Sequence, residues 1–471
     1  MNRVASTHSP INKPESDCPP EFLFMSSHCG IRARGIFERL CLPVRAIAES
    51  GEHGRARLRA ESEADARSTA CEAVFHTRLR EAFQRARDAG IANPIAIGAI
   101  PFDQSRPAQL SIPRSYEMFS RALEVERDMA ASNSVYPAPA HAGVTSNCQR
   151  VRQCKSVPEE TRFKQAVQQV IANFQLSDIR KAVLSRVLEL ELDGPLDLDA
   201  FFRHLLQQNP AGYHFRLPLV DGSQLIGASP ELLLRRRGSE VFSNPLAGSA
   251  RRLADPEQDR LVSEKLAQSA KDAYEHSLVI EDIRAQLQPL CRTLDVPEGP
   301  QLMHTSAMWH LSTPIRGTLA DPSLSALQVA CRLHPTPALC GFPTREAHKL
   351  IQLVEPFERG LFGGIVGWCD GDGNGEWAVA IRCGIFSDNH AQLFAGAGIV
   401  EDSDPDSEWQ ETRAKLQTML SALGIEPDAQ LSQEQSAGTD ELPCASLEAH
   451  TPHKASRTSR KQSEQKAGVT A

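Results

Sequence analysis

Apolar and polar positions alternate most clearly between Lys181 and Leu192. This period of two predicts a β-strand. One face of the strand carries a row of apolar side chains, namely Ala182, Leu184, Leu188, Leu190 and Leu192. The opposite face begins with Lys181, Val183 and Ser185, because successive side chains of a strand point to opposite sides.

A second pattern joins a strand to a helix. The apolar run 394–400 contains Gly396 and Gly398 and predicts a strand, and the recurrence of apolar residues from Trp409 to Leu423 then predicts a helix. Glu408, Glu411 and Lys415 are three and four residues apart, so they share one face of that helix. They could hold a divalent metal and an anionic ligand, or form a solvated Glu–Lys pair, and these eight residues leave both interpretations open.

The remaining pattern predicts an α+β fold with large antiparallel sheets flanked by helices. Further strands are predicted at 22–25, 95–100, 213–219, 224–229, 232–242, 365–369 and 377–383. Further helices are predicted at 71–89, 163–174, 197–208 and 256–288. The first of these helices has Val74, Leu79, Phe83 and Ala86 as its apolar stripe, while 245–252 is predicted to be a loop.

Composition suggests how the chain is divided. Residues 21–424 are expected to form a single catalytic domain. The proline-rich segment 1–20 is expected to be flexible, and 127–158 to be a polar surface connection. Residues 425–471 contain few large apolar side chains and are expected to be a disordered tail.

Charge and cysteine usage narrow the class of partner and the compartment. The 471 residues carry a net charge of −8, which gives no electrostatic reason to expect nucleic acid or an anionic membrane as partner. The twelve cysteines include no C-x-x-C pair, so reduced thiols are the default. There is no apolar run of membrane-spanning length and no secretory signal pattern, so a cytoplasmic protein is expected.

Two short motifs imitate known sites and fail on one residue each. The run Asp370–Gly375 resembles the start of a calcium-binding EF-hand loop, but the position that needs a bidentate glutamate is Ile381. Gly396 and Gly398 resemble a dinucleotide-binding fingerprint, but its third glycine would fall at Glu401. Neither site is predicted.

Several longer motifs occur together and in order. They are Arg180–Arg186, Gly227–Glu231, Pro245–Arg251, Lys271–His276 and Glu408–Lys415, with His334–Ala338 and Phe362–Trp368 in support. On these motifs the chain resembles the chorismate-utilising enzymes over residues 21–424. Within that family it is most similar to the isochorismate synthases of siderophore pathways.

The resemblance implies an isomerase that converts chorismate to isochorismate by adding water at C2 and expelling the C4 hydroxyl. It implies Lys181 as general base and Glu231 as general acid. Water is a poor nucleophile and hydroxide a poor leaving group, so one group must take a proton while another gives one. Lys181 must then be partly unprotonated near neutral pH. Glu231 must keep its proton, which an apolar pocket would favour by raising its pKa.

The resemblance also implies a magnesium ion held by Glu275 and Glu411, with Glu408 ordering a water at the metal. Asp272 has either a supporting role or none. The implied substrate-binding residues are Gly248, Ser249, His310, Ala338, Arg382, Gly396, Ala397, Gly398 and Lys415. Arg382 offers a planar fork suited to a carboxylate, and the glycines would let backbone N–H groups approach the substrate closely. A packed core histidine is the alternative for His310.

Two features bear on the branch of the family. Ala247 occupies the position where aminodeoxychorismate synthases carry a nucleophilic lysine, which argues against a covalent intermediate. The loop Ala247–Arg251 differs from the Ala-Gly-Thr-Arg usual in salicylate synthases. The sequence therefore favours release of isochorismate, with a salicylate synthase or a non-catalytic chorismate-binding relative as alternatives. A monomer fits the family.

Overall fold

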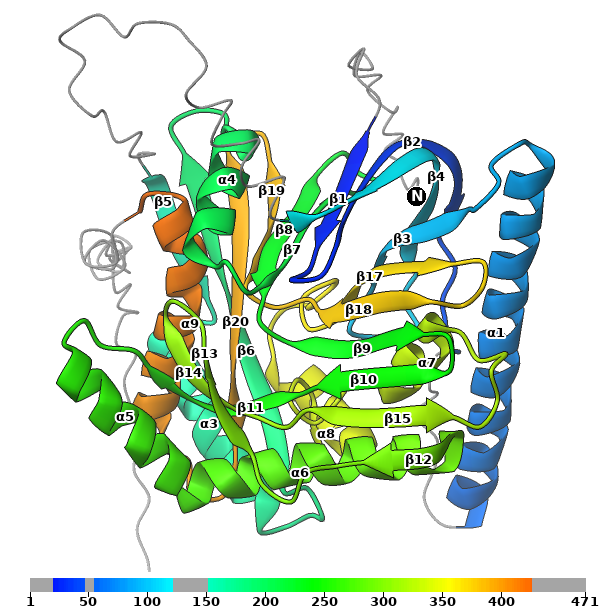
Figure 1. Cartoon of the computed structure of the whole chain (residues 1–471). Coiled ribbons are helices and arrows are strands. Elements are labelled where there is room, and N and C mark those ends of the chain that lie inside the picture. The colour runs from blue at the N-terminus through cyan, green and yellow to red at the C-terminus, as the bar shows by residue number, and fades with distance from the viewer. Residues whose placement is uncertain (1–19, 47–54, 122–150, 426–471) are drawn as a thin grey trace, which may run out of the picture.

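The computed structural model describes residues 20–46, 55–121 and 151–425 (Figure 1). The expectations of a flexible 1–20, of most of the 127–158 connection and of a disordered 425–471 lie almost wholly outside these ranges. None of the described helices is long and apolar enough to cross a membrane.

The strands are β1 (Glu21–Met25), β2 (Gly30–Leu40), β3 (Ile95–Ile100), β4 (Gln109–Phe119), β5 (Val151–Val157), β6 (Lys181–Leu192), β7 (Tyr213–Pro218), β8 (Gln224–Ser229), β9 (Leu232–Arg237), β10 (Glu240–Asn244), β11 (Leu246–Arg251), β12 (Cys291–Asp295), β13 (Gln301–His304), β14 (Met308–Ser312), β15 (Ile315–Leu319), β16 (Gly341–Phe342), β17 (Ile365–Asp370), β18 (Gly375–Val379), β19 (Cys383–Ser387) and β20 (His390–Ile399). The helices are α1 (Arg55–Asp88), α3 (Glu160–Phe174), α4 (Leu198–Gln208), α5 (Pro256–Gln268), α6 (Ala270–Leu287), α7 (Ala326–Leu333), α8 (Thr344–Val354) and α9 (Pro405–Ala422), with a 3₁₀ turn at Gln288–Leu290.

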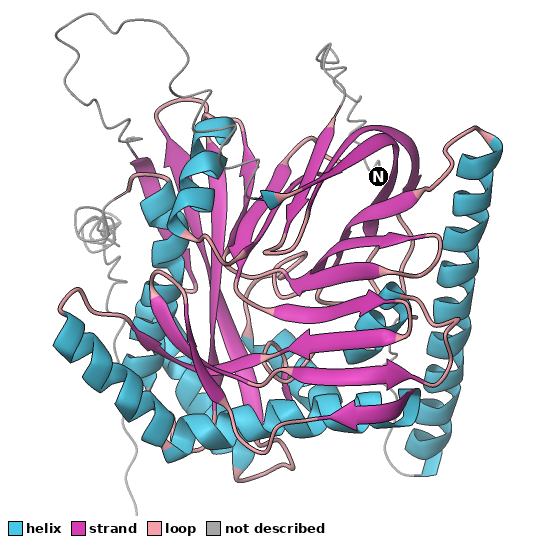
Figure 2. Ribbon diagram, in the orientation of Figure 1, coloured by secondary structure: helices cyan, strands magenta, loops and turns pink. Residues whose placement is uncertain are grey.

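The expected α+β architecture is confirmed. Within the described ranges, seventeen strands join one sheet system and β11, β14 and β13 form a small separate sheet. The strands pair in antiparallel fashion in the large sheet system and in the small sheet. In Figure 1 the strands around β6 and β20 run crosswise to the group β17, β18, β9, β10 and β15. Helices cover the outside of this assembly, with α1 along one edge and α5 and α6 below (Figure 2).

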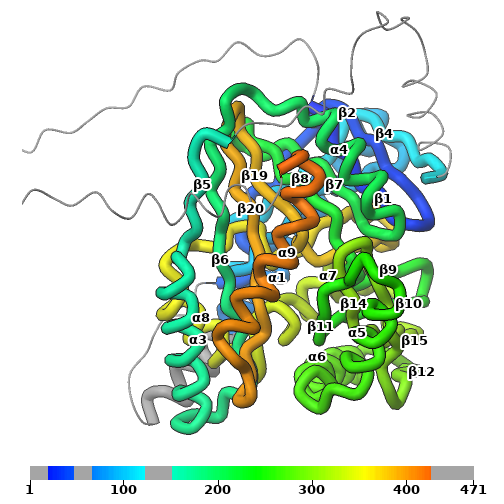
Figure 3. Tube along the Cα trace, turned by 90° about the vertical axis from the view of Figure 1, so that its left-hand side faces the viewer, coloured from blue at the N-terminus to red at the C-terminus, as the bar shows by residue number. Residues whose placement is uncertain are grey.

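The predicted strand 181–192 is confirmed as β6, and it forms the spine of the site. It pairs with β20 so that Val183 lies opposite Gly398 and Ser185 opposite Gly396. On one face Ala182 and Leu184 pack with side chains of α3 and with Trp409 of α9. Figure 3 shows α3 and α9 running along these strands. The other face, with Val183 and Ser185, is turned toward a cavity.

The helix predicted at 71–89 begins much earlier, at Arg55. Its first part is rich in Arg, Glu and Ala, which are strong helix formers but leave no apolar stripe for a periodicity argument to detect. The stripe itself needs one correction. Val74 is 57% exposed, and its neighbour Phe75 is buried with Leu79, Phe83 and Ala86.

Three further predictions around the site are wrong in detail. The strand 232–242 is a hairpin, because Gly238 has φ +58° and turns β9 back into β10. The helix 256–288 is two helices, because Ser269 is extended and caps α6 by accepting a hydrogen bond from Asp272 N–H. The loop 245–252 is the strand β11, which pairs with β14 and has an irregular register at Gly248.

Part of the expected surface connection is also structured. Val151–Val157 is β5, which pairs with the second half of β6. Periodicity could not predict this strand, because its apolar residues Val151, Cys154 and Val157 are three apart and show no period of two. The strand predicted at 377–383 ends at Val379, so Arg382 lies beyond it.

Candidate active site

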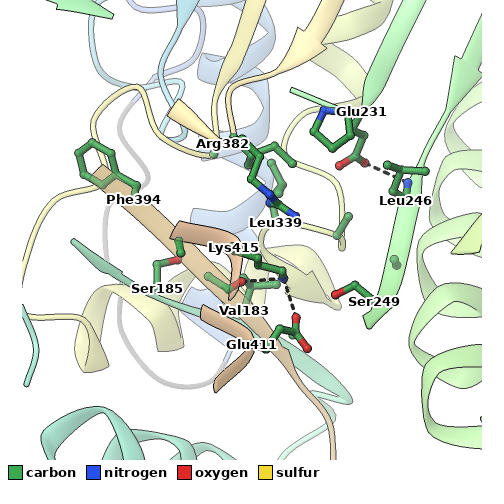
Figure 4. Close-up of a pocket in the computed structure, with 18 of the residues that line it drawn as sticks. Val183, Ser185, Glu231, Leu246, Ser249, Leu339, Arg382, Phe394, Glu411 and Lys415 are labelled. Atoms are coloured by element: carbon green, nitrogen blue, oxygen red, sulfur yellow. Dashed lines mark hydrogen bonds and ion pairs between the residues drawn. The ribbon is translucent and has the colours of Figure 1, made fainter. Parts of the chain in front are cut away.

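A cavity lies between β6, β20, β11 and the helices α6 and α9, and it gathers residues that are distant in sequence (Figure 4). The predicted site residues that line it are Glu231, Gly248, Ser249, Glu275, His310, Ala338, Arg382, Gly396, Gly398, Glu411 and Lys415. Of the predicted set, Lys181 and Ala397 are the two that do not line it.

Lys181 lies in the wall of this cavity, directly behind Glu275. Its side chain is fully buried, and its Nζ is 2.9 Å from Oε1 of Glu275. A Cβ on Gly398 would overlap the Glu275 carboxylate and press on Cε of Lys181. The glycine at 398 is therefore required to make room for this ion pair, a reason that the sequence alone did not indicate.

Glu231 follows the end of β8 and is 2% exposed. Burial raises its pKa to about 7, against the opposing influence of the Leu246 N–H and of the nearby Lys181 and Arg382 charges. The Leu246 amide donates to Oε1 at 3.3 Å, an interaction drawn in Figure 4. This carboxyl group is therefore protonated in a large fraction of molecules at neutral pH, as the expectation for a general acid requires.

Three more carboxylates gather where α6 meets α9. Burial alone would raise the pKa of Glu275, but the ammonium groups of Lys181, Lys415 and Lys271 hold it below its ordinary value. Glu408 is 1% exposed and pairs with Lys271 Nζ at 2.6 Å. Burial and the neighbouring Glu411 charge raise the pKa of Glu408 to about 7. Negative charge is thus crowded around Glu411.

Two cations also face the cavity, Arg382 from the residues before β19 and Lys415 from α9. Arg382 is buried and adopts φ +49°, a left-handed conformation uncommon outside glycine. Burial lowers its pKa to about 10, so the guanidinium stays charged at neutral pH. Lys415 Nζ lies 2.6 Å from Oε1 of Glu411 and donates to the Gly396 carbonyl at 2.8 Å. Figure 4 shows Arg382 and Lys415 converging on the same space.

The small sheet closes the opposite side of the cavity. Gly248 has φ +74° and packs closely on Asp272, so a side chain there would be both strained and crowded. His310 of β14 is 4% exposed, and its Nε2 has no hydrogen-bond partner among the described residues. Burial and the Arg382 charge hold the pKa of His310 well below its ordinary value, so the ring is neutral. His310 thus lines the cavity while being almost fully buried, and its part in substrate binding stays a prediction.

Ala397 is the predicted site residue whose side chain points away. It is fully buried in the cluster that contains Phe163 and Trp409, on the far side of β20. Neighbouring residues of a strand point to opposite sides. The prediction that Gly396, Ala397 and Gly398 all bind the substrate could therefore apply at Ala397 to its backbone groups only.

Sequence reasoning missed several lining residues, notably Ser185, Arg359, Phe362 and Phe394. A signal was present for Ser185, because it shares a strand face with Lys181 and Val183. Phe362 lies in a motif that carried the family resemblance. Arg359 had no local signal, since its contacts are all made in the folded chain.

Comparison with known proteins agrees with this geometry. The family model described as "Chorismate binding enzyme" matches residues 112–424. Isochorismate synthase EntC of Escherichia coli K12 is 41% identical over 407 residues, covering 86% of this chain and 95% of that protein. The vibriobactin-specific isochorismate synthase of Vibrio cholerae is 41% identical and covers 75% of this chain and 85% of its own.

A solved structure agrees as well. DhbC of Bacillus anthracis, named as a 2,3-dihydroxybenzoate-specific isochorismate synthase, superposes with a TM-score of 0.73 at 36% identity. The match covers 88% of this chain and 98% of that one. The likeness therefore extends through nearly all of the described residues.

Proposed function

The chain belongs to the chorismate-binding enzymes and groups there with the isochorismate synthases, and from this premise we propose that it converts chorismate to isochorismate. One observation carries the proposal. Glu231, a buried carboxylic acid with a pKa of about 7, lines the cavity. Glu275 lines the same cavity and pairs with the buried amine of Lys181. An acid and a base are the two groups that a hydroxyl exchange requires.

The proposed reaction forms a C–O bond at C2 and breaks the one at C4. Once the ammonium paired with Glu275 has released a proton, the uncharged amine of Lys181 accepts a proton from the attacking water while the ring double bonds shift. Glu231 donates its proton to the C4 hydroxyl, which leaves as water. Because one proton is taken up and one is released by the protein, a later exchange with solvent restores both groups.

The two carboxylates of chorismate need separate partners. Arg382 provides a charged planar fork in the cavity, and Lys415 adds a second positive charge nearby. Neutral His310 can contribute its unpartnered Nε2 to a polar group of the substrate. These residues lie on elements other than β6, so the groups that bind the substrate are separate from the proposed base.

Glu275 and Glu411 are proposed to hold a magnesium ion. They line one cavity from two helices, and the charge of Glu411 adds to burial in raising the pKa of the neighbouring Glu408. No group of three or more His, Cys, Asp or Glu side chains able to hold a metal is found within the described ranges. The proposed site has two protein carboxylates, and magnesium commonly uses few protein ligands. When bound, the ion would neutralise and orient a substrate carboxylate.

Chelation tests this part of the proposal. EDTA is expected to stop turnover and added magnesium to restore it. Glu411→Gln is expected to raise the magnesium concentration for half-maximal rate by about tenfold or more, since ligand carboxylates carry most of the protein's attraction for the ion. The exposed Glu401→Gln serves as control. A rate that chelation leaves unchanged would remove Glu275 and Glu411 from a metal-binding role.

The pH dependence tests the acid. A carboxyl group whose pKa is raised to about 7 is protonated below that pH and loses its proton as the pH rises through it. We therefore expect kcat/KM at saturating magnesium to fall on the alkaline side of about pH 7. A profile that stays level from about pH 6 to pH 9 would contradict the assignment of Glu231 as the acid.

The alternative is a salicylate synthase, which would go on to expel pyruvate. Incubation of the purified protein with chorismate and magnesium, followed by HPLC, separates the two. Isochorismate as the main product supports the proposal, whereas salicylate with pyruvate would replace it. Chorismate recovered unchanged would favour a non-catalytic binding protein.

The wider setting follows from the relatives. The proteins specific for vibriobactin and for 2,3-dihydroxybenzoate support a place in siderophore biosynthesis. A cytoplasmic location and a monomeric state complete the proposal, and nucleic acid and membrane have no part in it. Size-exclusion chromatography with light scattering checks the monomer.

A further inference from the structure

A buried ion pair lies at the wall of the cavity, which Arg359 lines, and takes no part in the chemistry proposed above. The side chains of Glu355 and Arg359 are 4% and 3% exposed. Arg359 donates from Nε to Oε2 of Glu355 at 2.8 Å and from Nη2 to Oε1 at 2.6 Å. Burying two charges is costly unless other hydrogen bonds compensate, so their remaining partners indicate what the pair does.

Those partners are backbone groups of β6. The Ser185 N–H donates to Oε1 of Glu355 at 2.7 Å, and the Val183 carbonyl accepts from Nη2 of Arg359 at 2.6 Å. The backbone N–H of Val183 donates to the Cys340 carbonyl at 2.9 Å.

A gap in the sheet explains these contacts. Along this edge of β6, the two-residue strand β16 pairs at Lys181 and Ala182, and β5 pairs only from Val187 onward. The backbone groups between them have no strand to bond with. Unsatisfied buried backbone groups are costly, and here the side chains of Glu355 and Arg359 take the place of the missing strand.

The same guanidinium reaches a second wall of the cavity. Its Nη1 donates to the Leu339 carbonyl at 2.7 Å, and its Cζ lies over the Phe102 ring at 4.4 Å from the ring centre. Leu339 and its neighbour Ala338 line the cavity. Every nitrogen of Arg359 is therefore engaged, and one planar group fixes β6 relative to the 338–339 segment.

We propose that Glu355 and Arg359 are a positioning pair, which holds the β6 segment bearing Lys181 at its working distance from the substrate pocket. This inference rests on the proposed function. It assigns the pair no contact with the reacting atoms. Lys181 stands two residues before the Val183 carbonyl that Arg359 holds, so a shift of this strand moves the base directly.

The proposal predicts a particular kinetic signature. Arg382 and Lys415 bind to neither member of the pair and lie on elements other than β6, so loss of the pair is expected to leave the two proposed carboxylate-binding cations in place. A displacement of the base by about 1 Å can cost on the order of 100-fold in rate. Loss of the pair should thus lower kcat while KM for chorismate changes little.

The experiment compares four single variants with wild-type enzyme. Glu355→Gln places an amide N–H₂ against the guanidinium, and Arg359→Lys removes the planar fork that reaches three partners at once. Each is expected to lower kcat at least about tenfold with KM within about threefold. Glu355→Asp keeps the charge and is expected to recover part of the loss. Glu358→Gln, on the same loop with a 77% exposed side chain, is the matched control and should behave as wild type.

Each outcome is decisive when wild-type enzyme produces isochorismate. Unchanged kcat in folded Glu355→Gln and Arg359→Lys would overturn the positioning role. A rise in KM that accounts for the whole fall in kcat/KM would also overturn it. Failure of both variants to fold would overturn it as well, because the pair would then be a determinant of the fold as a whole. If wild-type enzyme itself makes no isochorismate, the proposed function fails and the positioning role is lost with it.

Discussion

Replacement of Lys181 by alanine is expected to lower kcat by about 10²–10⁴-fold, the range that a positioned general base supplies. The reason is local. Lys181 is fully buried and its Nζ lies 2.9 Å from Glu275, at the wall of the cavity. Alanine offers no group that can accept the proton of the attacking water. Steady-state kinetics with HPLC detection of isochorismate measures the loss.

Two variants separate chemistry from folding. Lys181→Met keeps most of the side-chain volume without an amine and is expected to be as inactive as the alanine variant. Lys155→Ala, an exposed position on the neighbouring strand β5, is expected to retain wild-type kcat. Circular dichroism should show the same fold for Lys181→Ala, Lys181→Met and Lys155→Ala. Undiminished turnover in Lys181→Met would remove this residue from the mechanism.

Replacement of Glu231 by glutamine is expected to have a comparable effect, again about 10²–10⁴-fold on kcat. Glutamine has nearly the same shape and can still accept the Leu246 N–H, but it has no acidic proton to give to the leaving hydroxyl. Because burial raises the pKa of the native group to about 7, a large fraction of it is already neutral near pH 7, and replacement by a neutral amide should change thermal stability little.

The control for Glu231 is Glu240→Gln, an exposed glutamate at the start of β10. It should leave kcat and melting temperature unchanged. If Glu231→Gln kept near-normal turnover, the leaving hydroxyl would have to obtain its proton from another group. The account of Glu231 as acid would then be wrong even if the product were isochorismate.

Local sequence patterns predicted the strand and the helix on which the site is built. The alternation from Lys181 to Leu192 defined β6 with its ends, because one face packs on helices and the other faces the cavity. The motif around Glu411 fell correctly on a helix, α9. Both elements have strong periodicity, which local sequence records directly.

Contacts between distant segments were beyond such reasoning. The pairing of Lys181 with Glu275 depends on the Glu275 side chain reaching from α6 to β20 beside Gly398, and no local pattern encodes that. The support that Glu355 and Arg359 give to β6 arises from a gap between two partner strands. The break at Ser269 was missed because the apolar spacing continues across it, whereas the turn at Gly238 had a signal, a Gly-Ser pair between two apolar runs.

Turnover of chorismate in water enriched with ¹⁸O tests the central claim most directly. If Lys181 activates a solvent water for attack at C2 while Glu231 releases the C4 hydroxyl, mass spectrometry should find isochorismate with one ¹⁸O atom, located at C2. Isochorismate without the label would show that the original hydroxyl migrates. Salicylate and pyruvate as the main products would show that the cavity performs a different reaction.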